Sequence, residues 1–388
     1  MASPICEKAI AEALGHGTAI LKFISPNDVG VTGGHQCGFY LPKSVWKLFT
    51  PHAPTRGRLD KHEVKIIWQD QYETKSVITW YGRETRSEYR LTRFGKCFPF
   101  LVPDSVGDLL MLIPKTKKEF LAYVFDLDDD IEEVMASLGV EPFEHWAVYR
   151  KDGAEQVDDA SCLERKFQIF AGKLNKFPSG KDFSQATLKI MRECVSNFAR
   201  MSKDEMLLDC YRTEYRLFQV VERRLCQSEI ARLFKDVDDF LKTAASIMNR
   251  RKSRAGRSLE NHVDHILTDA KIPHEMQPRI DGKPDIIIPS TKAYLSSSYP
   301  KDKIFVVGVK TTCKDRWRQV LNEGKRIRKK HILTLQPSIS SNQLKEMHKA
   351  NVTLVVPERL KKDYPKNHPL EILNMEDFVR KVGVKQVR

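Results

Sequence analysis

The sequence predicts two domains of mixed α and β structure: a strand-dominated first domain that forms a small barrel, and an α/β second domain with a central sheet. Three observations predict this fold class. The chain has 388 residues, which is more than a single hydrophobic core normally serves. Its first 150 residues consist of short strand patterns broken by turns. Beyond Phe183, apolar residues recur at helical spacing, and short apolar strands separate the helices.

The first domain, residues 1–150, contains four segments typical of strands. Apolar and polar side chains alternate in two of them, and β-forming residues dominate the other two. These segments are Val64–Trp68, Glu88–Arg93, Ser76–Tyr81 and Phe120–Phe125. Asp128–Leu138 has the pattern of an acidic helix, and Thr32-Gly33-Gly34-His35 is a loop signal.

A linker is predicted over residues 151–180, where two breaks interrupt the pattern. Lys151–Ala160 is polar and acidic, and Phe177-Pro178-Ser179-Gly180 follows a short predicted helix at Leu163–Lys173. The hinge between the domains is expected at one of these two breaks.

The second domain, residues 181–388, mixes helices with short strands around one predicted sheet. Helical spacing of apolar residues predicts helices at Gln185–Met201, Asp204–Phe234, Ser258–Asp269 and Arg316–Lys329. Short apolar runs predict strands at Asp285–Ile288, Ile304–Val309, His331–Leu335 and Val352–Val356.

The charge of the chain favours a polyanionic partner. The net charge is +14, which suits nucleic acid or an acidic membrane surface. No stretch approaches the long apolar run of a membrane helix, and Met1–Leu21 lacks a signal-peptide pattern. We therefore expect a cytoplasmic protein without a membrane partner.

The eight cysteines are scattered, and none forms a C-x-x-C pair. This pattern argues against a zinc site. A disulfide framework is not expected in a chain of this length without a secretory signal. The sequence therefore predicts reduced, buried thiols.

Pro284-Asp285, followed after a loop by Gly308-Val309-Lys310, is the pattern that carries chemistry. An Asp at the start of one strand and a Lys at the end of the next can meet over one sheet edge. Cleavage of a phosphodiester bond needs a hard cation held by oxygen ligands, such as Mg²⁺, and an activated water. Asp285 could bind the metal, and Lys310 could orient the water or stabilise developing charge.

This arrangement is the P-D…(D/E)-x-K pattern of many restriction-type nucleases, with one departure. Gly308 occupies the position of the second acidic residue. Two other carboxylates could compensate for this missing acidic residue. Glu323 lies on the predicted helix after the strand that ends near Lys310, and Glu260 lies on the predicted helix before the strand of Asp285. The alternative is that Asp285 caps a turn and Lys310 ends a strand in solvent.

Basic residues surround these positions. Arg or Lys can donate to guanine and Asp can accept from cytosine, so Lys314, Asp315 and Arg316 suit consecutive G·C pairs. Two basic tracts, one with Arg254 and Arg257, could neutralise phosphates. The alternative is a set of solvated, salt-bridged helix faces.

Together these residues resemble the EcoRII family of type II (type IIE) restriction endonucleases. The resemblance lies in Arg254–Glu260, Pro284-Asp285 and, most specifically, Val309–Gln319. It extends to the N-terminal half through Asn27-Asp28, Thr32–Gln36, Trp80-Tyr81-Gly82 and Thr85–Tyr89.

The resemblance implies a restriction-endonuclease fold for the second domain and a B3-like pseudobarrel for the first. It implies a Mg²⁺-dependent endonuclease that cuts duplex DNA at a CCWGG or CCNGG palindrome and leaves a five-base 5′ overhang. The first domain would bind a second DNA copy as effector. A homodimer suits a palindrome, and a restriction role implies a cognate DNA cytosine methyltransferase.

The resemblance also implies roles for particular residues. The catalytic set is Asp285, Lys310, Glu323, Glu260 and, in a supporting role, Tyr294, with Asp285 and Glu323 as metal ligands. The DNA contacts of the second domain are Lys314, Asp315, Arg316, Arg254, Arg257 and Arg212, with Arg212, Tyr215 and Arg216 as candidates for a base-flipping platform. Those of the first domain are Asn27, Thr32, His35, Gln36, Arg83, Arg86, Glu88 and Arg90.

Other readings of these residues stay open. Without the resemblance, His35 fits a loop histidine bonded to nearby backbone, and Tyr215 fits a core position. A non-catalytic DNA-binding regulator with a decayed nuclease domain is the main alternative function. A polyanion binder without sequence preference is another, although it would gain nothing from Asp315. Decay is disfavoured because all four candidate catalytic positions still carry acidic or basic residues.

Overall fold

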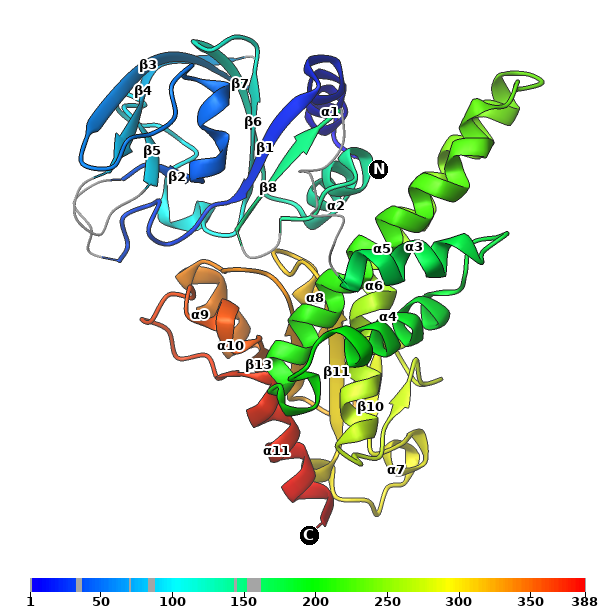
Figure 1. The fold of residues 1–388 in the computed structure, drawn as a ribbon. Helices are drawn as coiled ribbons and strands as arrows, with labels where there is room; N and C mark the ends of the chain where they lie inside the picture. The colour runs from blue at the N-terminus through cyan, green and yellow to red at the C-terminus, as the bar shows by residue number, and fades with distance from the viewer. Residues whose placement is uncertain are drawn as a thin grey trace. The chain divides into compact units, whose positions relative to one another are not determined.

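A computed structural model describes residues 2–32, 37–69, 71–82, 88–142, 145–151 and 162–387 (Figure 1). The chain divides into two compact units. The first comprises Met1–Ala154, Gln336–Glu346 and Asp363–Pro369, and the second comprises Glu155–Leu335, Met347–Lys362 and Leu370–Arg388. None of the described helices combines the length and the apolar character that crossing a bilayer requires.

An eight-stranded sheet in the order β2-β5-β4-β3-β7-β6-β1-β8 forms the first unit, and it curls around its own core (Figure 1). Its neighbours are antiparallel except for the parallel pair β3 and β7. The strands are β1 (Thr18–Phe23), β2 (Phe39–Leu41), β3 (Leu59–Trp68), β4 (Tyr72–Tyr81), β5 (Glu88–Thr92), β6 (Leu109–Pro114), β7 (Glu119–Phe125) and β8 (Trp146–Arg150). All four predicted strands are present, and each differs from the prediction at one end only.

Two apolar clusters fill the first unit, one on each face of the sheet. An aromatic cluster with Phe39, Trp68 and Phe98 lies inside the curl. The helices α1 (Pro4–His16) and α2 (Asp128–Leu138) cover β1, β6 and β7 on the other face. The predicted acidic helix is therefore confirmed, and short 3₁₀ helices lie at Lys43–Leu48 and Pro103–Ser105.

Two segments from late in the chain belong to the first unit. The Gln336 side-chain amide donates to the carbonyl of Gly107 over 3.1 Å, and Asn342 donates to Asp104 over 2.8 Å. Gly107 has a φ of +91°, and a Cβ there would lie 2.7 Å from the Ser338 carbonyl oxygen. This approach is possible only for glycine.

The second unit holds a six-stranded sheet in the order β14-β13-β12-β11-β10-β9. β11 to β14 run parallel to one another, whereas β9, β10 and β11 are antiparallel neighbours. The strands are β9 (Glu275–Met276), β10 (Ile286–Ile288), β11 (Phe305–Lys310), β12 (Lys330–Thr334), β13 (Val352–Val355) and β14 (Ile372–Leu373).

Helices of very different length accompany this sheet. They are α3 (Cys162–Gly172), α4 (Gly180–Cys194), α5 (Lys203–Ala231), α6 (Val237–Asp269), α7 (Thr291–Leu295), α8 (Trp317–Val320), α10 (Glu358–Lys361) and α11 (Met375–Val387), with 3₁₀ turns at Phe198–Arg200 and Lys301–Lys303. The helix α9 (Ser341–Lys349) belongs to the first unit up to Glu346 and to the second unit from Met347. α5 and α6 pack against each other and extend together beyond the rest of the unit (Figure 1). The predicted helix at Ser258–Asp269 is thus the last third of a much longer one.

The predicted helix at Arg316–Lys329 is wrong, because only Trp317–Val320 is helical. Gly324 has a φ of +52°, and a Cβ there would lie 2.8 Å from a methyl group of Val306. The chain therefore turns sharply at this position instead of continuing the helix.

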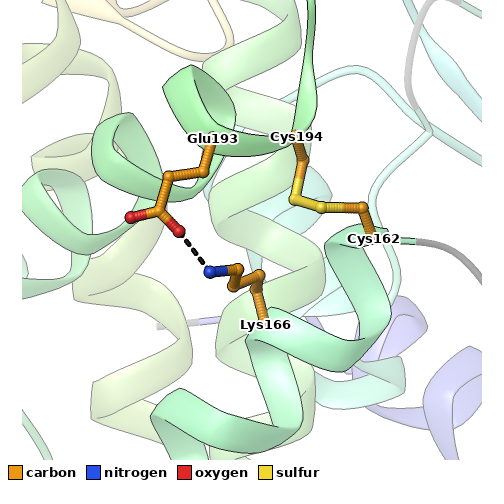
Figure 2. Close-up of a disulfide and its surroundings, with 4 residues drawn as sticks. All are labelled: Cys162, Lys166, Glu193 and Cys194. Carbon is orange, nitrogen blue, oxygen red and sulfur yellow. Dashed lines mark ion pairs between the residues drawn. A yellow bond between two sulfur atoms is a disulfide. The ribbon is translucent and has the colours of Figure 1, made fainter.

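A disulfide corrects the cysteine prediction. Cys162 at the start of α3 is bonded to Cys194 at the end of α4 (Figure 2). The two helices pack side by side and place the two Cα atoms 5.6 Å apart, within the range that a disulfide bridges. An ion pair between Lys166 and Glu193 lies next to it. Cys37 and Cys97 are exposed, not buried as predicted.

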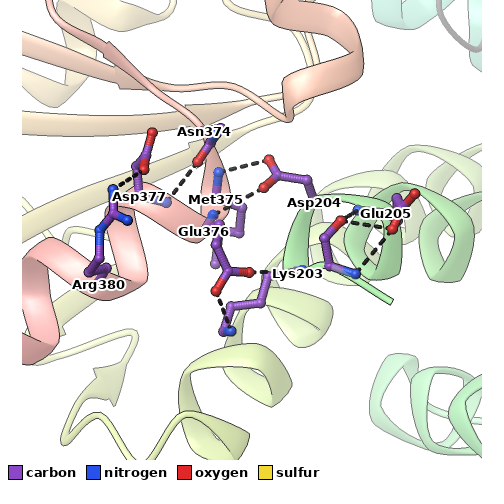
Figure 3. Close-up of polar contacts among 9 residues, drawn as sticks. Lys203, Asp204, Glu205, Asn374, Met375, Glu376, Asp377 and Arg380 are labelled. Carbon is purple, nitrogen blue, oxygen red and sulfur yellow. Dashed lines mark hydrogen bonds and ion pairs between the residues drawn. The ribbon is translucent and has the colours of Figure 1, made fainter. Parts of the chain in front are cut away.

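A buried carboxylate ties the start of α5 to two helices near the C-terminus. Asp204 accepts from the backbone N–H groups of Met375 and Glu376 over 2.8 and 3.1 Å (Figure 3). It also accepts from the backbone N–H of Glu358 over 3.0 Å. These groups belong to the first turns of α10 and α11, which have no partner within their own helices. A carboxylate is favourable there because the helix dipole is positive at the N-terminus. Lys203 adds an ion pair with Glu376 over 2.8 Å.

We expect Asp204→Asn to lower the free energy of unfolding by about 1–3 kcal/mol, because charged hydrogen bonds to three backbone donors are lost. Denaturant unfolding would measure this. Exposed Asp238→Asn in α6 is the control, for which a change within about 0.5 kcal/mol is expected. Equal stability of the two variants would contradict a capping role for Asp204.

Candidate active site

β10 and β11 bring Asp285 and Lys310 together. Asp285 immediately precedes β10, and Lys310 is the last residue of the neighbouring β11. The Asp285 Oδ2 atom accepts from Lys310 Nζ over 2.8 Å and from the Val309 backbone N–H over 2.7 Å. The Asp285 residue is only 8% exposed. The strands therefore hold the carboxylate and the ammonium in one fixed pair.

Glu260 reaches the same place from α6 through a residue that the sequence did not reveal. The Gln277 side-chain amide donates to Glu260 Oε2 over 2.7 Å and approaches Asp285 Oδ1 at 3.4 Å. Its backbone N–H also donates to the Asp285 carbonyl over 2.8 Å. Gln277 thus bridges the two carboxylates from the end of β9.

Glu323 lies in the turn after α8, and a facing loop holds that turn. Gly282 has a φ of +74°, and a Cβ there would lie 2.5 Å from both the Asn322 carbonyl oxygen and the Glu323 Cα. Asp281 accepts from the backbone N–H of Lys325 over 2.6 Å through its side chain, and its carbonyl accepts from Gly324 N–H. The loop before Pro284 therefore packs directly on the turn that presents Glu323.

Gly308 leaves no room for an acidic side chain two residues before Lys310. A Cβ at this position would lie 2.7 Å from a methyl group of Val320 in α8. Close packing of α8 on β11 takes the space that an Asp or Glu would need. An acidic residue at position 308 would therefore require α8 to move.

Tyr294 lies on α7 and contacts the loop of Asp281 and the turn that follows Glu323. Its hydroxyl donates to Asp281 Oδ1 over 2.6 Å and accepts from the Arg326 backbone N–H over 3.2 Å. It packs in an apolar cluster under β10 and β11 with Ile287 and Val306. Its contacts make it a positioning residue for the Glu323 turn.

A buried lysine, which the sequence analysis did not identify, lies beneath the turn that carries Glu323. Lys330 is 2% exposed, and its ammonium donates to the carbonyl of Gly324 over 2.8 Å and to that of Ile327. Burial lowers the pKa of Lys330, while Asp281 and Glu323 oppose that shift. The ammonium therefore adds a partner to the Gly324 carbonyl, which also accepts from the Ile327 N–H, and gives one to the Ile327 carbonyl.

Two of the carboxylic acids, Glu323 and Glu260, hold their protons more tightly than free side chains do. Burial raises the pKa of Glu323 to about 7, and the negative charge of Asp285 adds to the shift while Lys310 opposes it. Burial likewise raises the pKa of Glu260, against the hydrogen bond from Gln277. A group of acids that resist losing their protons together is suited to receiving a cation.

The stability of the metal-free protein should depend on pH through Glu323. Its pKa is about 7 in the folded protein, against an ordinary value of 4.5, so folding retains a proton between these two values. The contribution of Glu323 to stability is therefore greatest below pH 4.5 and falls as the pH rises to 7.

We expect wild-type stability to fall relative to that of Glu323→Gln between pH 5 and pH 8, because glutamine cannot ionise. Urea unfolding in EDTA at several pH values measures the difference. A difference that stays constant or grows in favour of the wild type would contradict the raised pKa.

Asp285 and Glu323 are the residues that would hold a divalent cation at this site. Mg²⁺ sites in phosphoryl-transfer enzymes use one or two carboxylates together with water and substrate phosphate. The Glu323 Oε2 atom is buried, and no described residue hydrogen-bonds to it. Within the described ranges, no three His, Cys, Asp or Glu side chains lie close enough to hold an ion by themselves. Water and phosphate would complete the coordination.

The other DNA-contact candidates of this unit differ in their exposure and in their distance along the chain from the carboxylates. Lys314 is buried, and Asp315 and Arg316 are half-buried, in the segment between β11 and α8. Arg257 is exposed on α6, one turn before Glu260. Arg212 lies half-buried on α5.

The placement of Arg254 does not suit a phosphate contact. It is 7% exposed, and its guanidinium lies over the rings of Tyr211, Tyr215 and Phe218, 4.8 Å from that of Tyr215. Burial lowers its pKa to about 9. Tyr215 is buried in this layer, and Arg216 is paired with Glu164 over 2.8 Å.

Four of the eight residues predicted to contact DNA in the first unit lie among the described residues. Asn27 and Thr32 are exposed, and the Thr32 hydroxyl donates to Asn27 over 3.3 Å. Glu88 and Arg90 lie on β5, with 3.6 Å between their charged atoms. The candidates His35, Gln36, Arg83 and Arg86 lie outside the described residues.

Asp28, next to Asn27, is a buried anchor that the sequence showed only as part of the resemblance. Its carboxylate pairs with Lys22 over 2.5 Å and accepts from the Tyr40 N–H over 2.8 Å. It thus joins the end of β1 to β2 across the base of the loop that carries Asn27 and Thr32.

Family models match both halves of the chain. The model described as EcoRII C terminal matches residues 218–379. The model described as the N-terminal domain of the restriction endonuclease EcoRII matches residues 16–151.

Two curated relatives are restriction enzymes. The chain is 32% identical over 383 residues to the type II restriction enzyme EcoRII of Escherichia coli, and the match covers 92% of each chain. It is 29% identical over 150 residues to the type II restriction enzyme SsoII of Shigella sonnei, which covers 35% of this chain and 48% of that protein.

Solved structures that match the chain in part include metal-depleted Ecl18kI with uncleaved, modified DNA and a PspGI–substrate DNA complex. The first is 22% identical and covers 58% of this chain and 84% of its own, with a TM-score of 0.45. The second is 15% identical and covers 54% of this chain and 93% of its own, also with a TM-score of 0.45.

The predicted fold class and the predicted resemblance are both confirmed, the resemblance through matches that cover the two halves of the chain. The chain therefore belongs to the EcoRII family of type II restriction endonucleases, and it is a site-specific nuclease.

Proposed function

We propose that this protein cuts both strands of duplex DNA at a short G·C-flanked palindrome in a Mg²⁺-dependent reaction. The observation that carries the proposal is the convergence of Glu260, Asp285 and Glu323 on Lys310 at the ends of β10 and β11. Two carboxylates with raised pKa values, beside a third carboxylate and one ammonium, suit hydrolysis at phosphorus better than simple DNA binding.

Each residue has a distinct proposed role. Asp285 and Glu323 would hold Mg²⁺, which supplies Lewis-acid activation of the phosphate and of a bound water. Lys310 would orient the attacking water and stabilise charge that develops on the phosphate oxygens. Glu260, kept in place by Gln277, would carry a proton at the edge of the site. Tyr294 would hold the Glu323 turn.

The proposed substrate is a CCWGG or CCNGG site, cut to leave a 5′ overhang. Lys314, Asp315 and Arg316 would read the G·C pairs, with Arg257 and Arg212 as supporting contacts. Because the site is a palindrome, the acting species would be a homodimer. A cytosine methyltransferase would protect the host DNA in the cytoplasm.

The first domain, proposed as residues 1–150, would bind a second DNA copy as effector, and residues 181–388 would form the catalytic domain after a linker at 151–180. The supporting observation is that Asn27, Thr32, Glu88 and Arg90 lie on one strand and one loop of the barrel. Strands and loops of this kind can place polar side chains against base edges in a groove.

The test is incubation of the full chain with a plasmid that carries several CCWGG sites, with Mg²⁺ or with EDTA. Discrete fragments with Mg²⁺ alone, and cut ends that map to those sites, are the expected result. A specific mobility shift without cutting would favour the non-catalytic DNA-binding regulator, and neither cutting nor binding would overturn both.

The effector role is tested in trans with a plasmid that carries one site. A short duplex with the same site should accelerate its cleavage, whereas a scrambled duplex should not. Cleavage that is equally fast with either duplex would contradict the effector role and leave the nuclease proposal intact.

A further inference from the structure

A cationic hollow of about 600 Å³ lies on the first unit, and no residue discussed so far as a DNA contact lines it. It is formed over the middle of β3 and β4, the end of β5 and the turn between β6 and β7. We call it the cationic hollow because six cations line it: Lys61, Lys65, Lys75, Arg93, Lys117 and Lys118. One carboxylate, that of Glu63, shares its lining.

Most of these cations have no counter-ion. Lys65 pairs with Glu73 over 2.8 Å. Within the described ranges, Lys65 is the one cation of the six for which an ion pair is present. Like charges held together around a concave surface repel one another, and they focus a positive potential into the hollow. Such a surface is suited to an anion that carries several charges.

The backbone fixes this arrangement of charges. The Lys65 N–H donates to the Lys118 carbonyl over 2.8 Å, which holds the β6–β7 turn against β3. The Ser76 hydroxyl donates to the Arg93 carbonyl over 3.1 Å, which holds the end of β5 against β4. The hollow is therefore a feature of the sheet and not of a single long loop.

Strand register places the hollow on the same sheet face as Arg90. Lys61 lies opposite Thr79, and Thr79 lies opposite Arg90, so the three side chains form one row across β3, β4 and β5. Directly opposite residues in neighbouring strands point to the same face. Lys75 and Lys65 form a parallel row further along the sheet.

We propose that the cationic hollow binds the phosphodiester backbone of the duplex that the barrel holds, beside the bases that Glu88 and Arg90 would contact. The inference rests on the proposed DNA-binding role of the first domain and adds a phosphate-binding surface to it. Five of the ligands are lysines, which act as point charges without the planar fork that reads a base. The contact is therefore independent of sequence and lengthens the stretch of DNA that the barrel grips.

The experiment measures binding of the full chain to a duplex with one CCWGG site by fluorescence anisotropy, in EDTA and at several salt concentrations. Lys61→Ala/Lys75→Ala removes two cations from the hollow. Lys8→Ala/Lys151→Ala removes two exposed cations from α1 and from the end of β8, and serves as the matched control. Both double variants should fold, because the substituted side chains are exposed.

We expect the slope of log K against log salt to fall by about 2 in the hollow variant, since each lost phosphate contact removes about 0.9. The loss should be the same for a scrambled duplex, and the control should keep the wild-type slope. An unchanged slope in the hollow variant, with normal wild-type binding, would overturn this inference alone. No wild-type binding at low salt would overturn the proposed function as well.

A free phosphoanion is the other source of the same chemistry. Inorganic pyrophosphate at constant ionic strength should raise the thermal midpoint of the wild type and of the hollow variant equally. A shift that only the wild type shows, together with an unchanged salt slope, would mean that the hollow takes a small phosphoanion and not DNA.

Discussion

Lys310→Ala is expected to lower the rate of DNA cleavage by a factor of about 10²–10³, because one charged donor to the developing phosphate charge is lost. Binding of the duplex should change little, since Lys310 makes one contact among many. Alanine also leaves the Asp285 carboxylate without its cationic partner, from which it is separated by 2.8 Å in the wild type. Single-turnover cleavage and anisotropy measure the two effects separately.

Exposed Lys292→Ala on α7 is the control for loss of one positive charge in the same unit. Its cleavage rate should match the wild type. A Lys310→Ala protein that cuts at the wild-type rate would remove Lys310 from the proposed chemistry. One that no longer binds DNA would mean that its role is in binding and not in the chemical step.

Gly282→Ala is expected to lower cleavage by about 100-fold, although residue 282 would touch neither DNA nor metal. The added Cβ would meet the Asn322 carbonyl and the Glu323 Cα at 2.5 Å, and alanine is strained at a φ of +74°. Because the neighbours are backbone atoms, the turn with Glu323 must shift. The Mg²⁺ concentration for half-maximal cleavage should therefore rise, while DNA affinity stays near that of the wild type.

Gly256→Ala is the matched control, since residue 256 lies inside α6 with open space around its Cα. Replacing this glycine should stabilise the protein by about 0.5–1 kcal/mol and leave cleavage unchanged. If Gly282→Ala behaves like Gly256→Ala, the loop of Asp281 and Gly282 does not set the position of Glu323.

Local patterns predicted the elements that flank the site but not the contacts that complete it. Alternation and apolar runs located β10 and β11, and so placed Asp285 beside Lys310. The Asp281-Gly282 dipeptide is a turn signal that could have indicated the loop at Glu323. Gln277 and Lys330 gave no signal, because their roles depend on pairing between elements distant in sequence.

The failed helix at Arg316–Lys329 shows why such patterns mislead. Apolar residues do recur there at helical spacing, yet Gly324 adopts a left-handed conformation, and Asp281 binds the N–H of Lys325. Tertiary hydrogen bonds outweigh a helix preference of a few tenths of a kcal/mol per residue. Cys162 and Cys194 were mispredicted for a similar reason, since only the packing of α3 on α4 brings them together.

The first unit is assembled from three separate stretches of chain, Met1–Ala154, Gln336–Glu346 and Asp363–Pro369. A gene rearrangement that exchanged only the first 154 codons between two relatives would supply a barrel without its two late pieces. Gly107 would then face a foreign segment where the Ser338 carbonyl now lies within 2.7 Å of its Cβ position. The two halves of this enzyme are thus expected to have diverged together, and recombinants that join barrels and nuclease domains from distant relatives should be poorly folded.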